Sequence, residues 1–360
     1  MFRILDRGSL PLLLLVVLPF APAARAGVTN PNISVIGIMR LFTTNDSTDI
    51  NHDRAQFSLD ETEIQADAAL NPFANGTFVF AIADGGIEVE EGYFYITHGL
   101  PRGLGFKAGK YRVGFGKLNP MHDHAYPFIE RFRVLAAYLP GDESYNEIGG
   151  QVSYRIPFPG DVSSILSMDV LQGNSLHPDE PDSRPAWLGR WSNFFLVKDP
   201  SALELGVDVS QGTNNVAAKT MTTLYGADAK LKWWFNARDF LMLQAEVLGM
   251  DREDPTVDDQ GNVTVNHMKP FGGYIFGDYT FRKLYNAGLK YERFQRPEQD
   301  ANGDKPWDAS VGAWTGLSLL EETTLFRLNW DRFLPKDAQA YNTFTLQALW
   351  SMGPHKAHQF

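Results

Sequence analysis

The sequence predicts an all-β protein: a transmembrane antiparallel β-barrel of about 16 strands (14 is the alternative), with one loop folded inward as a constriction. Three observations carry this prediction. Segments of about ten residues alternate apolar and polar side chains along most of the chain. They are longer than the ~5–6 residues usual for strands in soluble proteins and match the ~9–11 residues of membrane strands. Short turns and long polar connections separate them.

The alternation gives each segment an apolar face and a polar face. Residues 323–333 place Phe326, Leu328 and Trp330 on one face and Arg327, Asn329 and Asp331 on the other. Residues 225–233, 239–251 and 341–352 repeat the pattern. In lipid, only closure of the sheet satisfies the backbone groups of every strand. We therefore expect the apolar face to contact hydrocarbon and the polar face to enclose water.

Connection lengths differ in the way that outer-membrane barrels show. The short turns are 235–240, 281–285 and 319–324, and the long polar connections are 174–200, 252–266 and 296–306. The longest early connection, 117–147, is rich in Pro, His and aromatic residues. We expect this connection to be the loop that folds into the barrel.

The first 26 residues have the three parts of a cleaved signal peptide. Arg3 and Arg7 form a basic start, residues 10–20 form an apolar core, and Ala24 and Ala26 supply the small residues at the cleavage site. We expect cleavage after Ala26, export, and a barrel formed by residues 27–360. The expected location is the bacterial outer membrane.

Composition excludes several classes of protein. The formal net charge is −11, so the basic face that nucleic acid requires is not expected. The chain has no Cys, which excludes disulfides, thiolate metal sites and thiol nucleophiles. The motifs of serine hydrolases, zinc proteases and phosphate-binding loops are also missing. We expect no enzyme activity and no cofactor.

Three segments resemble a known family. Residues 86–116 read GIEVEEGYFYITHGLPRGLGFKAGKYRVGFG, residues 117–133 read KLNPMHDHAYPFIERFR, and residues 146–154 read NEIGGQVSY. In order and spacing they resemble the phosphate-selective porin (O/P type) superfamily of outer-membrane channels. The resemblance covers about 70 residues, counted over these segments. It implies a water-filled barrel of about 16 strands that passes small solutes, and a homotrimer.

The expected function is an outer-membrane porin that lets small hydrophilic solutes or ions diffuse through the barrel. No run of arginines comparable to that of the phosphate-selecting members is present, so the solute stays open. The alternative is a barrel that acts as a sheath or scaffold for a periplasmic partner such as an electron-transfer cytochrome. A soluble periplasmic β-protein is a third hypothesis. Expected partners are the lipid bilayer, lipopolysaccharide and the solutes.

The candidate pore residues lie in the long loop and on the strands. Inward-folded loops narrow large barrels and place charges where a solute loses water. The expected constriction residues are His122, Asp123, His124, Glu130, Arg131 and Arg133. Arg131 and Arg133 would attract anions, and Asp123 and Glu130 would oppose them. The expected lumenal charges on the strands are Lys110, Arg112, Glu246 and Arg327.

Two clusters suggest cations, and for each a solvated or structural interpretation is favoured. His122 and His124 could converge on one metal ion from an extended backbone, with Asp123 pointing away, but a third ligand is needed. We therefore expect no metal site. Residues 300–304 resemble the start of a calcium loop without its final Glu.

Acidic residues are concentrated on the early strands, and Lys and Arg residues on neighbouring strands could pair with them. The acidic residues are Asp60, Glu61, Glu63, Asp67, Glu88, Glu90 and Glu91. Strict alternation predicts that Glu90 and Glu91 do not both face the lumen. We expect a salt-bridged wall rather than a selectivity filter.

Overall fold

The computed structural model describes residues 31–83, 86–96, 98–141, 144–177, 184–257, 260–298, 305–319 and 323–353. The expected leader, the segment 300–304 and the terminal Phe360 lie outside these residues. Within the described ranges, no helix is long and apolar enough to cross a membrane.

Nearly all regular structure is strand, with one short α-helix and two 3₁₀ turns. The first strands are β1 (Asn32–Thr44), β2 (Gln56–Asn71), β3 (Ala74–Ala83), β4 (Gly86–Ile96), β5 (Leu104–Arg112), β6 (Asn146–Ile156), β7 (Val162–Leu171), β8 (Ala186–Lys198) and β9 (Ser201–Asn215). The remaining strands are β10 (Thr220–Trp234), β11 (Phe240–Val257), β12 (Val263–Met268), β13 (Phe271–Phe281), β14 (Tyr285–Gln295), β15 (Trp307–Leu319), β16 (Thr324–Leu334) and β17 (Tyr341–Met352). The helix α1 is Arg133–Tyr138, and the 3₁₀ turns are Asp123–Ala125 and Asn174–Leu176.

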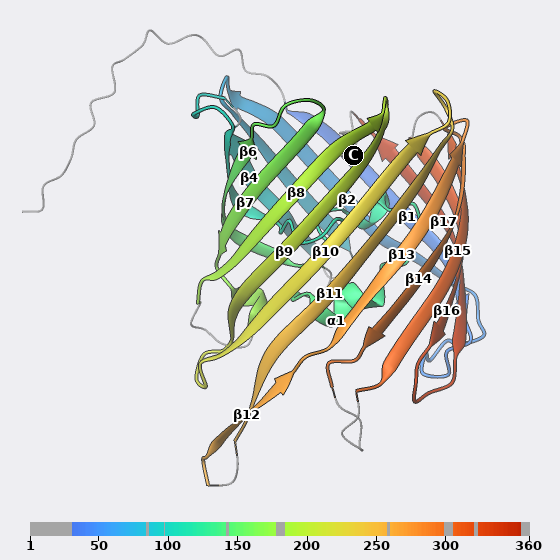
Figure 1. The fold of residues 1–360 in the computed structure, drawn as a ribbon. Coiled ribbons are helices and arrows are strands. Elements are labelled where there is room, and N and C mark those ends of the chain that lie inside the picture. The colour runs from blue at the N-terminus through green and yellow to red at the C-terminus, as the bar shows by residue number, and fades with distance from the viewer. Residues whose placement is uncertain are drawn as a thin grey trace, which may run out of the picture. The chain divides into compact units, whose positions relative to one another are not determined.

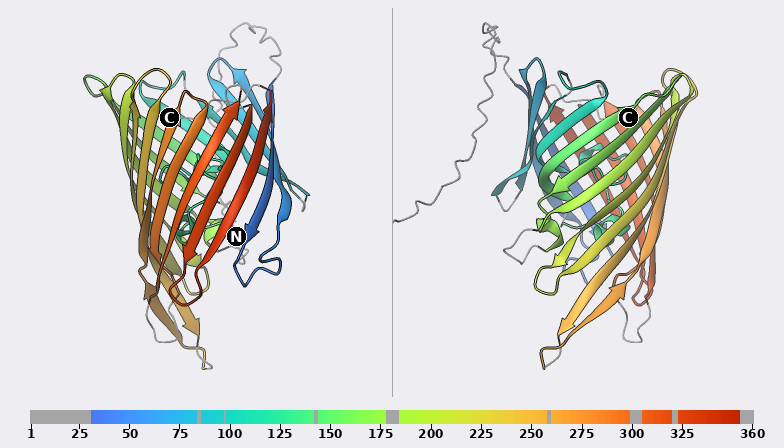
Figure 2. Two further views of the ribbon diagram at one scale, coloured as in Figure 1. Left: turned by 90° about the vertical axis from the view of Figure 1, so that its right-hand side faces the viewer. Right: turned by 60° about the vertical axis from the view of Figure 1, so that its left-hand side comes forward.

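The sheet closes into an antiparallel barrel (Figure 1). Each strand pairs with its neighbour in sequence, and β1 pairs with both β2 and β17, which completes the ring. β12 pairs with the end of β11, while the first part of β11 pairs directly with β13. The barrel therefore has 16 strands, as expected, and β12 stands outside the ring. Figure 2 shows β12 and the end of β11 projecting beyond the barrel rim.

The alternation predicted from the sequence is confirmed. On β16, Leu328 is 53% exposed and the next residue, Asn329, is 1% exposed. On β11, Leu243 and Val247 are exposed, whereas Gln244 and Glu246 are buried. Since the polar residues face the inside of the ring, the barrel has an apolar outer surface and a polar inner wall.

The connections agree with the expected pattern in part. The turns 235–239 and 282–284 are short, as predicted, and lie at one end of the barrel; β15 ends at Leu319 and β16 begins at Thr324, so that connection is short too. The expected connection 174–200 is wrong, because Ala186–Lys198 forms β8. The expected connection 252–266 is also wrong, because β11 continues to Val257 and pairs with β12. Polar and charged side chains concealed this strand pairing, which lies beyond the barrel and needs no apolar face.

The longest connection is 113–145, between β5 and β6. This loop, called the inner segment here, carries α1 and lies inside the ring behind β9–β13 in Figure 1. Its apolar side chains join those of the wall in one buried cluster. The expectation that this loop folds inward is confirmed.

The outer face yields a stability prediction. Leu328→Arg places a charge on the lipid face near the middle of β16, and we expect it to lower the free energy of unfolding by about 2–4 kcal/mol. Ile50→Arg is the matched control, because Ile50 is exposed in the connection between β1 and β2. Denaturant unfolding in lipid vesicles measures both variants. Equal effects at the two positions would contradict a lipid-facing Leu328.

Candidate functional site in the barrel lumen

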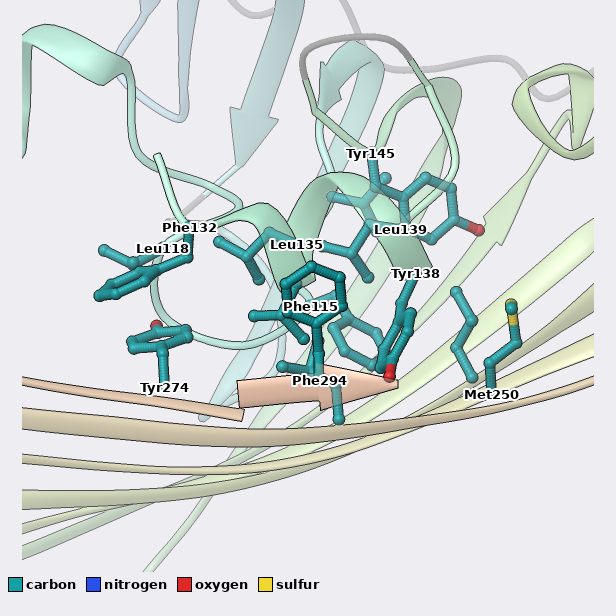
Figure 3. Close-up of a cluster of buried hydrophobic side chains, with 14 of the residues drawn as sticks. Phe115, Leu118, Phe132, Leu135, Tyr138, Leu139, Tyr145, Met250, Tyr274 and Phe294 are labelled. Atoms are coloured by element: carbon teal, nitrogen blue, oxygen red, sulfur yellow. The ribbon is translucent and has the colours of Figure 1, made fainter. Parts of the chain in front are cut away.

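The inner segment packs against one side of the barrel wall through aromatic residues. The ring centroid of Phe128 lies 5.1 Å from that of Phe276 on β13 and 5.3 Å from that of Trp314 on β15. Phe132 stacks on Tyr274 of β13 at 4.0 Å. Figure 3 shows Phe132 and Tyr138 directed toward the wall residues Tyr274 and Phe294. The segment therefore covers the inner wall on the β7–β15 side.

Carboxylates of the wall hold the start of the segment. Three consecutive backbone N–H groups point at them: Gly116 donates to Asp208 at 3.2 Å, and Lys117 and Leu118 donate to Glu246. Gly116 has φ +64°, and a Cβ there would lie 2.6 Å from a Glu246 oxygen. Only glycine accommodates both the positive φ and the close approach.

Hydrogen bonds also fix the far end of the segment. The N–H of Val134 at the start of α1 donates to Glu292 of β14 at 3.0 Å. The hydroxyl of Tyr138 at the end of α1 donates to the carbonyl of Gln295 at 2.8 Å. Lys290 of β14 donates to the carbonyl of Glu130 at 2.7 Å. Because both ends are bonded and the middle is packed, the segment has one defined position.

A polar hollow of about 600 Å³ lies on the other side of the segment. Its walls are the segment itself and the inner faces of β1, β2 and β14–β17. The charged residues that line it are Arg40, Asp46, Asp49, Asp60, Asp123, Glu130, Arg131, Arg133, Lys290, Glu292, Asp331 and Arg332. A second hollow of about 750 Å³ lies between α1 and β10–β12, and Ala136 lines both.

The charges in the hollow are partly paired. Arg40 pairs with Asp60 and lies 3.4 Å from Glu130, and Lys290 lies 2.8 Å from Asp331. The Arg40–Glu130 pair joins the segment to β1, and the Lys290–Asp331 pair joins β14 to β16.

Arg131 and Arg133 are held differently. Arg131 donates to the amide oxygen of Asn119 at 3.3 Å. Arg133 donates to the Tyr341 hydroxyl at 3.0 Å and lies 4.2 Å above the Phe333 ring. Among the described residues, no carboxylate oxygen lies within 4.0 Å of either guanidinium. Both arginines therefore bring positive charge to the wall of the hollow.

The six expected constriction residues separate into two groups. Asp123, Glu130, Arg131 and Arg133 line the hollow, together and on the same segment. His122 and His124 lie behind it, in contact with carboxylates of β2 and β4.

Three of the four expected lumenal charges face inward. Glu246 binds the segment, Arg112 pairs with Glu90, and Arg327 donates to the carbonyl of His124 at 3.2 Å.

The expectation for the fourth residue, Lys110, is wrong, because it does not face the lumen. It pairs in register with Ile148, which is 55% exposed, while the next residue, Tyr111, is fully buried. Lys110 therefore lies on the outer face, where its Nζ is 3.1 Å from Glu88. A long aliphatic stem lets a lysine on the outer face reach a charged partner.

The expectation for Glu90 and Glu91 is also wrong. Both carboxylates are buried inside the barrel. The β3–β4 pairing shifts by one residue, since Val79 faces Glu91 and Phe80 faces Val89, so Glu90 is the extra residue of a β-bulge. A bulge places two consecutive side chains on one face.

The bulge brings both glutamates to His122. The ring of His122 lies 3.0 Å from Glu63, 3.4 Å from Glu90 and 3.2 Å from Glu91. Burial and Arg112 both lower the pKa of His122, but its hydrogen bonds to the three carboxylates outweigh them and raise the pKa well above its usual value.

The candidate residues chosen from the sequence did not include the charged residues on the barrel wall that faces the inner segment across the hollow. Arg40, Lys290 and Asp331 line the hollow from β1, β14 and β16. The alternation contained the signal that each faces inward, because each occupies the polar position of its strand. Which strands face the segment across the lumen depends on the closed ring and was not readable from the sequence.

Comparisons with known proteins agree with this architecture. No family model matches the sequence. An uncharacterized protein of Aquifex aeolicus is 26% identical over 341 residues, which covers 86% of this chain and 71% of that protein.

Solved structures share the fold. The outer-membrane channel DcaP of Acinetobacter baumannii matches with TM-score 0.59 and 13% identity, covering 91% of this chain and 99% of that one. The anion-selective porin of Comamonas acidovorans matches with TM-score 0.59 and 12% identity, covering 89% and 100%. A loop-deleted OmpT, an outer-membrane protein of Vibrio cholerae, matches with TM-score 0.57 and 11% identity, covering 90% and 100%. The chain therefore has the 16-stranded fold of outer-membrane barrels that include porins.

The packing of the inner segment can be tested directly. Phe128→Ala removes a fully buried ring from the cluster, and we expect a loss of packing energy of about 3–5 kcal/mol. Because the strand pairing is untouched, the barrel should stay folded while chymotrypsin cuts residues 113–145 at least ~10-fold faster. Phe158→Ala, in the turn between β6 and β7 and half exposed, is the matched control. Unchanged cleavage in Phe128→Ala would contradict the packing described here.

Proposed function

We propose that the protein is a porin of the bacterial outer membrane that lets small hydrophilic solutes or ions diffuse passively through its lumen. One observation carries the proposal: a charge-lined hollow lies inside a closed barrel whose outer surface is apolar. Such a barrel is stable in lipid, and its polar interior replaces part of a solute's hydration. The solved channels and porins that share the fold support the same function.

The inner segment sets the size of the passage in this proposal. Its aromatic side fills the lumen toward β7–β15, which leaves the hollow beside β1, β2 and β14–β17 as the route. Ala136 of α1 lines both this hollow and the second one, which extends to β11 and β12. A solute would pass Arg131, Arg133 and Glu130 on the way.

The charge of the route argues for weak ion preference. The residues that line the hollow include five basic and seven acidic side chains, and several of them are paired. Phosphate selection of the O/P type would need a surplus of basic groups. We therefore assign a general solute class, and the resemblance of residues 86–154 to the O/P family supports the channel rather than phosphate as its solute.

Location and assembly are part of the proposal. The signal peptide expected at residues 1–26 supports export, and the barrel supports insertion in the outer membrane beside lipopolysaccharide. A homotrimer is proposed from the resemblance; OmpT of Vibrio cholerae, with TM-score 0.56 to this chain, has a solved trimer form.

The alternatives have less support. A sheath for a cytochrome would need free space in the lumen, and the inner segment occupies the β7–β15 side of it. Among the described residues, we find no feature that favours the sheath, and we propose no enzyme activity.

Channel activity is the first test. In planar bilayers, the purified full-length protein should give stable single-channel currents that rise in proportion to salt concentration. Non-electrolytes small enough to enter should lower the current, and larger ones should not. A folded, inserted barrel without steady conductance would contradict the porin assignment.

The ion preference of the route is the second test. Arg131→Gln with Arg133→Gln should shift the reversal potential in a salt gradient toward cations, and Asp123→Asn with Glu130→Gln should shift it toward anions. If each charge contributes ~0.5 kcal/mol, each pair changes the permeability ratio roughly fivefold.

A matched control accompanies this measurement. Arg102→Gln with Arg238→Gln removes the same charge from exposed turns at the end of the barrel away from β12. This double variant should leave the reversal potential unchanged. Equal shifts in the control and the Arg131/Arg133 variant would contradict a route past the inner segment.

A further inference from the structure

His122, His124 and Glu63 converge behind the hollow. Glu63 Oε2 on β2 lies 3.0 Å from His122 Nδ1 and 3.3 Å from His124 Nδ1. One ligand atom from each of the three residues lies within 4.8 Å of the others. Ligand atoms on a tetrahedral zinc ion, bonded at ~2.0–2.1 Å, lie about 3.3 Å apart. The two distances from Glu63 Oε2 are close to this spacing.

The backbone presents the two imidazoles to the same side. His122 has φ −74° and ψ 151°, an extended conformation, and the His122 and His124 rings stack at 5.6 Å. Asp123 between them points away, with its side chain 46% exposed and near Arg112. His124 lies in the 3₁₀ turn Asp123–Ala125, which directly follows the extended His122. The third ligand that the sequence left open comes from another strand, β2.

Burial and charge both favour a cation at this place. Glu63 is 5% exposed, and its second oxygen, Oε1, is buried and accepts no hydrogen bond. Three carboxylates (Glu63, Glu90, Glu91) contact His122, and the Arg112 guanidinium pairs with Glu90 and lies 3.8 Å from Asp123. With neutral histidines, these four carboxylates and Arg112 carry −4 + 1 = −3, a negative charge that a divalent ion would offset. Glu61, Glu63 and Glu90 form a second oxygen cluster beside it.

We propose that Glu63, His122 and His124 bind a divalent transition-metal ion, with Zn²⁺ as the best fit and Glu90 as the adjacent carboxylate. Two imidazole nitrogens and one carboxylate oxygen form a ligand set suited to zinc. The ion would join the inner segment to β2, on the side of the segment opposite its aromatic packing. It would therefore fasten the segment across the lumen, whatever solute the barrel passes.

The test is zinc binding by the purified full-length barrel. After chelator treatment, ZnCl₂ is titrated by calorimetry, and bound zinc is counted by elemental analysis after dialysis. We expect one zinc per chain with a dissociation constant below about 1 μM, since three protein ligands are preformed. X-ray absorption at the zinc edge should show imidazole nitrogen in the coordination shell.

Substitution of the proposed ligands tests whether zinc binds at this site. Glu63→Gln and His124→Gln should each weaken zinc binding at least ~10-fold, because removing even supporting groups of a metal site costs 10–100-fold. His267→Gln is the matched control: His267 lies 3.3 Å from Asp251, but at the exposed β11–β12 hairpin. It should bind zinc as the wild type does.

Two results would overturn the proposal. The first is wild-type binding only at millimolar zinc, which would leave His122 and His124 as hydrogen-bonded partners of the glutamates. The second is undiminished affinity in Glu63→Gln and His124→Gln. If a variant fails to fold, the wild-type stoichiometry and absorption spectrum still decide the question.

Discussion

The structure depends on one constraint: every backbone N–H and C=O group of a strand in lipid needs a partner within the protein. The pairing of β1 with β17 satisfies this constraint, because it closes the sheet. The paired residues run from Val35 opposite Met352 to Thr44 opposite Thr343. Closure removes both sheet edges and gives every strand an inside and an outside. The alternation of apolar and polar residues follows from this geometry, and so does a lumen.

A ring of 16 strands is too wide for wall side chains to fill, so its interior is open unless the chain occupies it. Here residues 113–145 occupy one side through Phe128, Phe132 and their aromatic neighbours, while carboxylates at Asp208 and Glu246 bind its start. The other side stays hollow and is lined by charged residues. Apolar packing and ionic pairing thus divide one lumen into a filled half and a hollow half.

The sequence predicted the barrel, its strand number and the loop that enters it, because period-two alternation and connection length are local signals. It also predicted that Glu246 and Arg327 face inward. It failed at β8, at β12, where polar residues concealed the strand, and at Glu90 and Lys110. There a bulge and the pairing of β5 decide which face a side chain takes, and neither follows from alternation. Glu63 as a partner of His122 could not be predicted, because the contact joins β2 to the inner segment, far along the chain, and depends on how that segment folds into the barrel.

Site-directed thiol labelling tests the division of the lumen most directly, since the chain has no cysteine of its own. Ser58→Cys lines the hollow, whereas Ser210→Cys lies under Tyr145 on the filled side, where Ser210 is 1% exposed. With each variant in a planar bilayer, a charged thiol reagent should react quickly at residue 58 and reduce the current, and should leave residue 210 unmodified. Equal reaction at both positions, or reaction at residue 210 alone, would contradict the account.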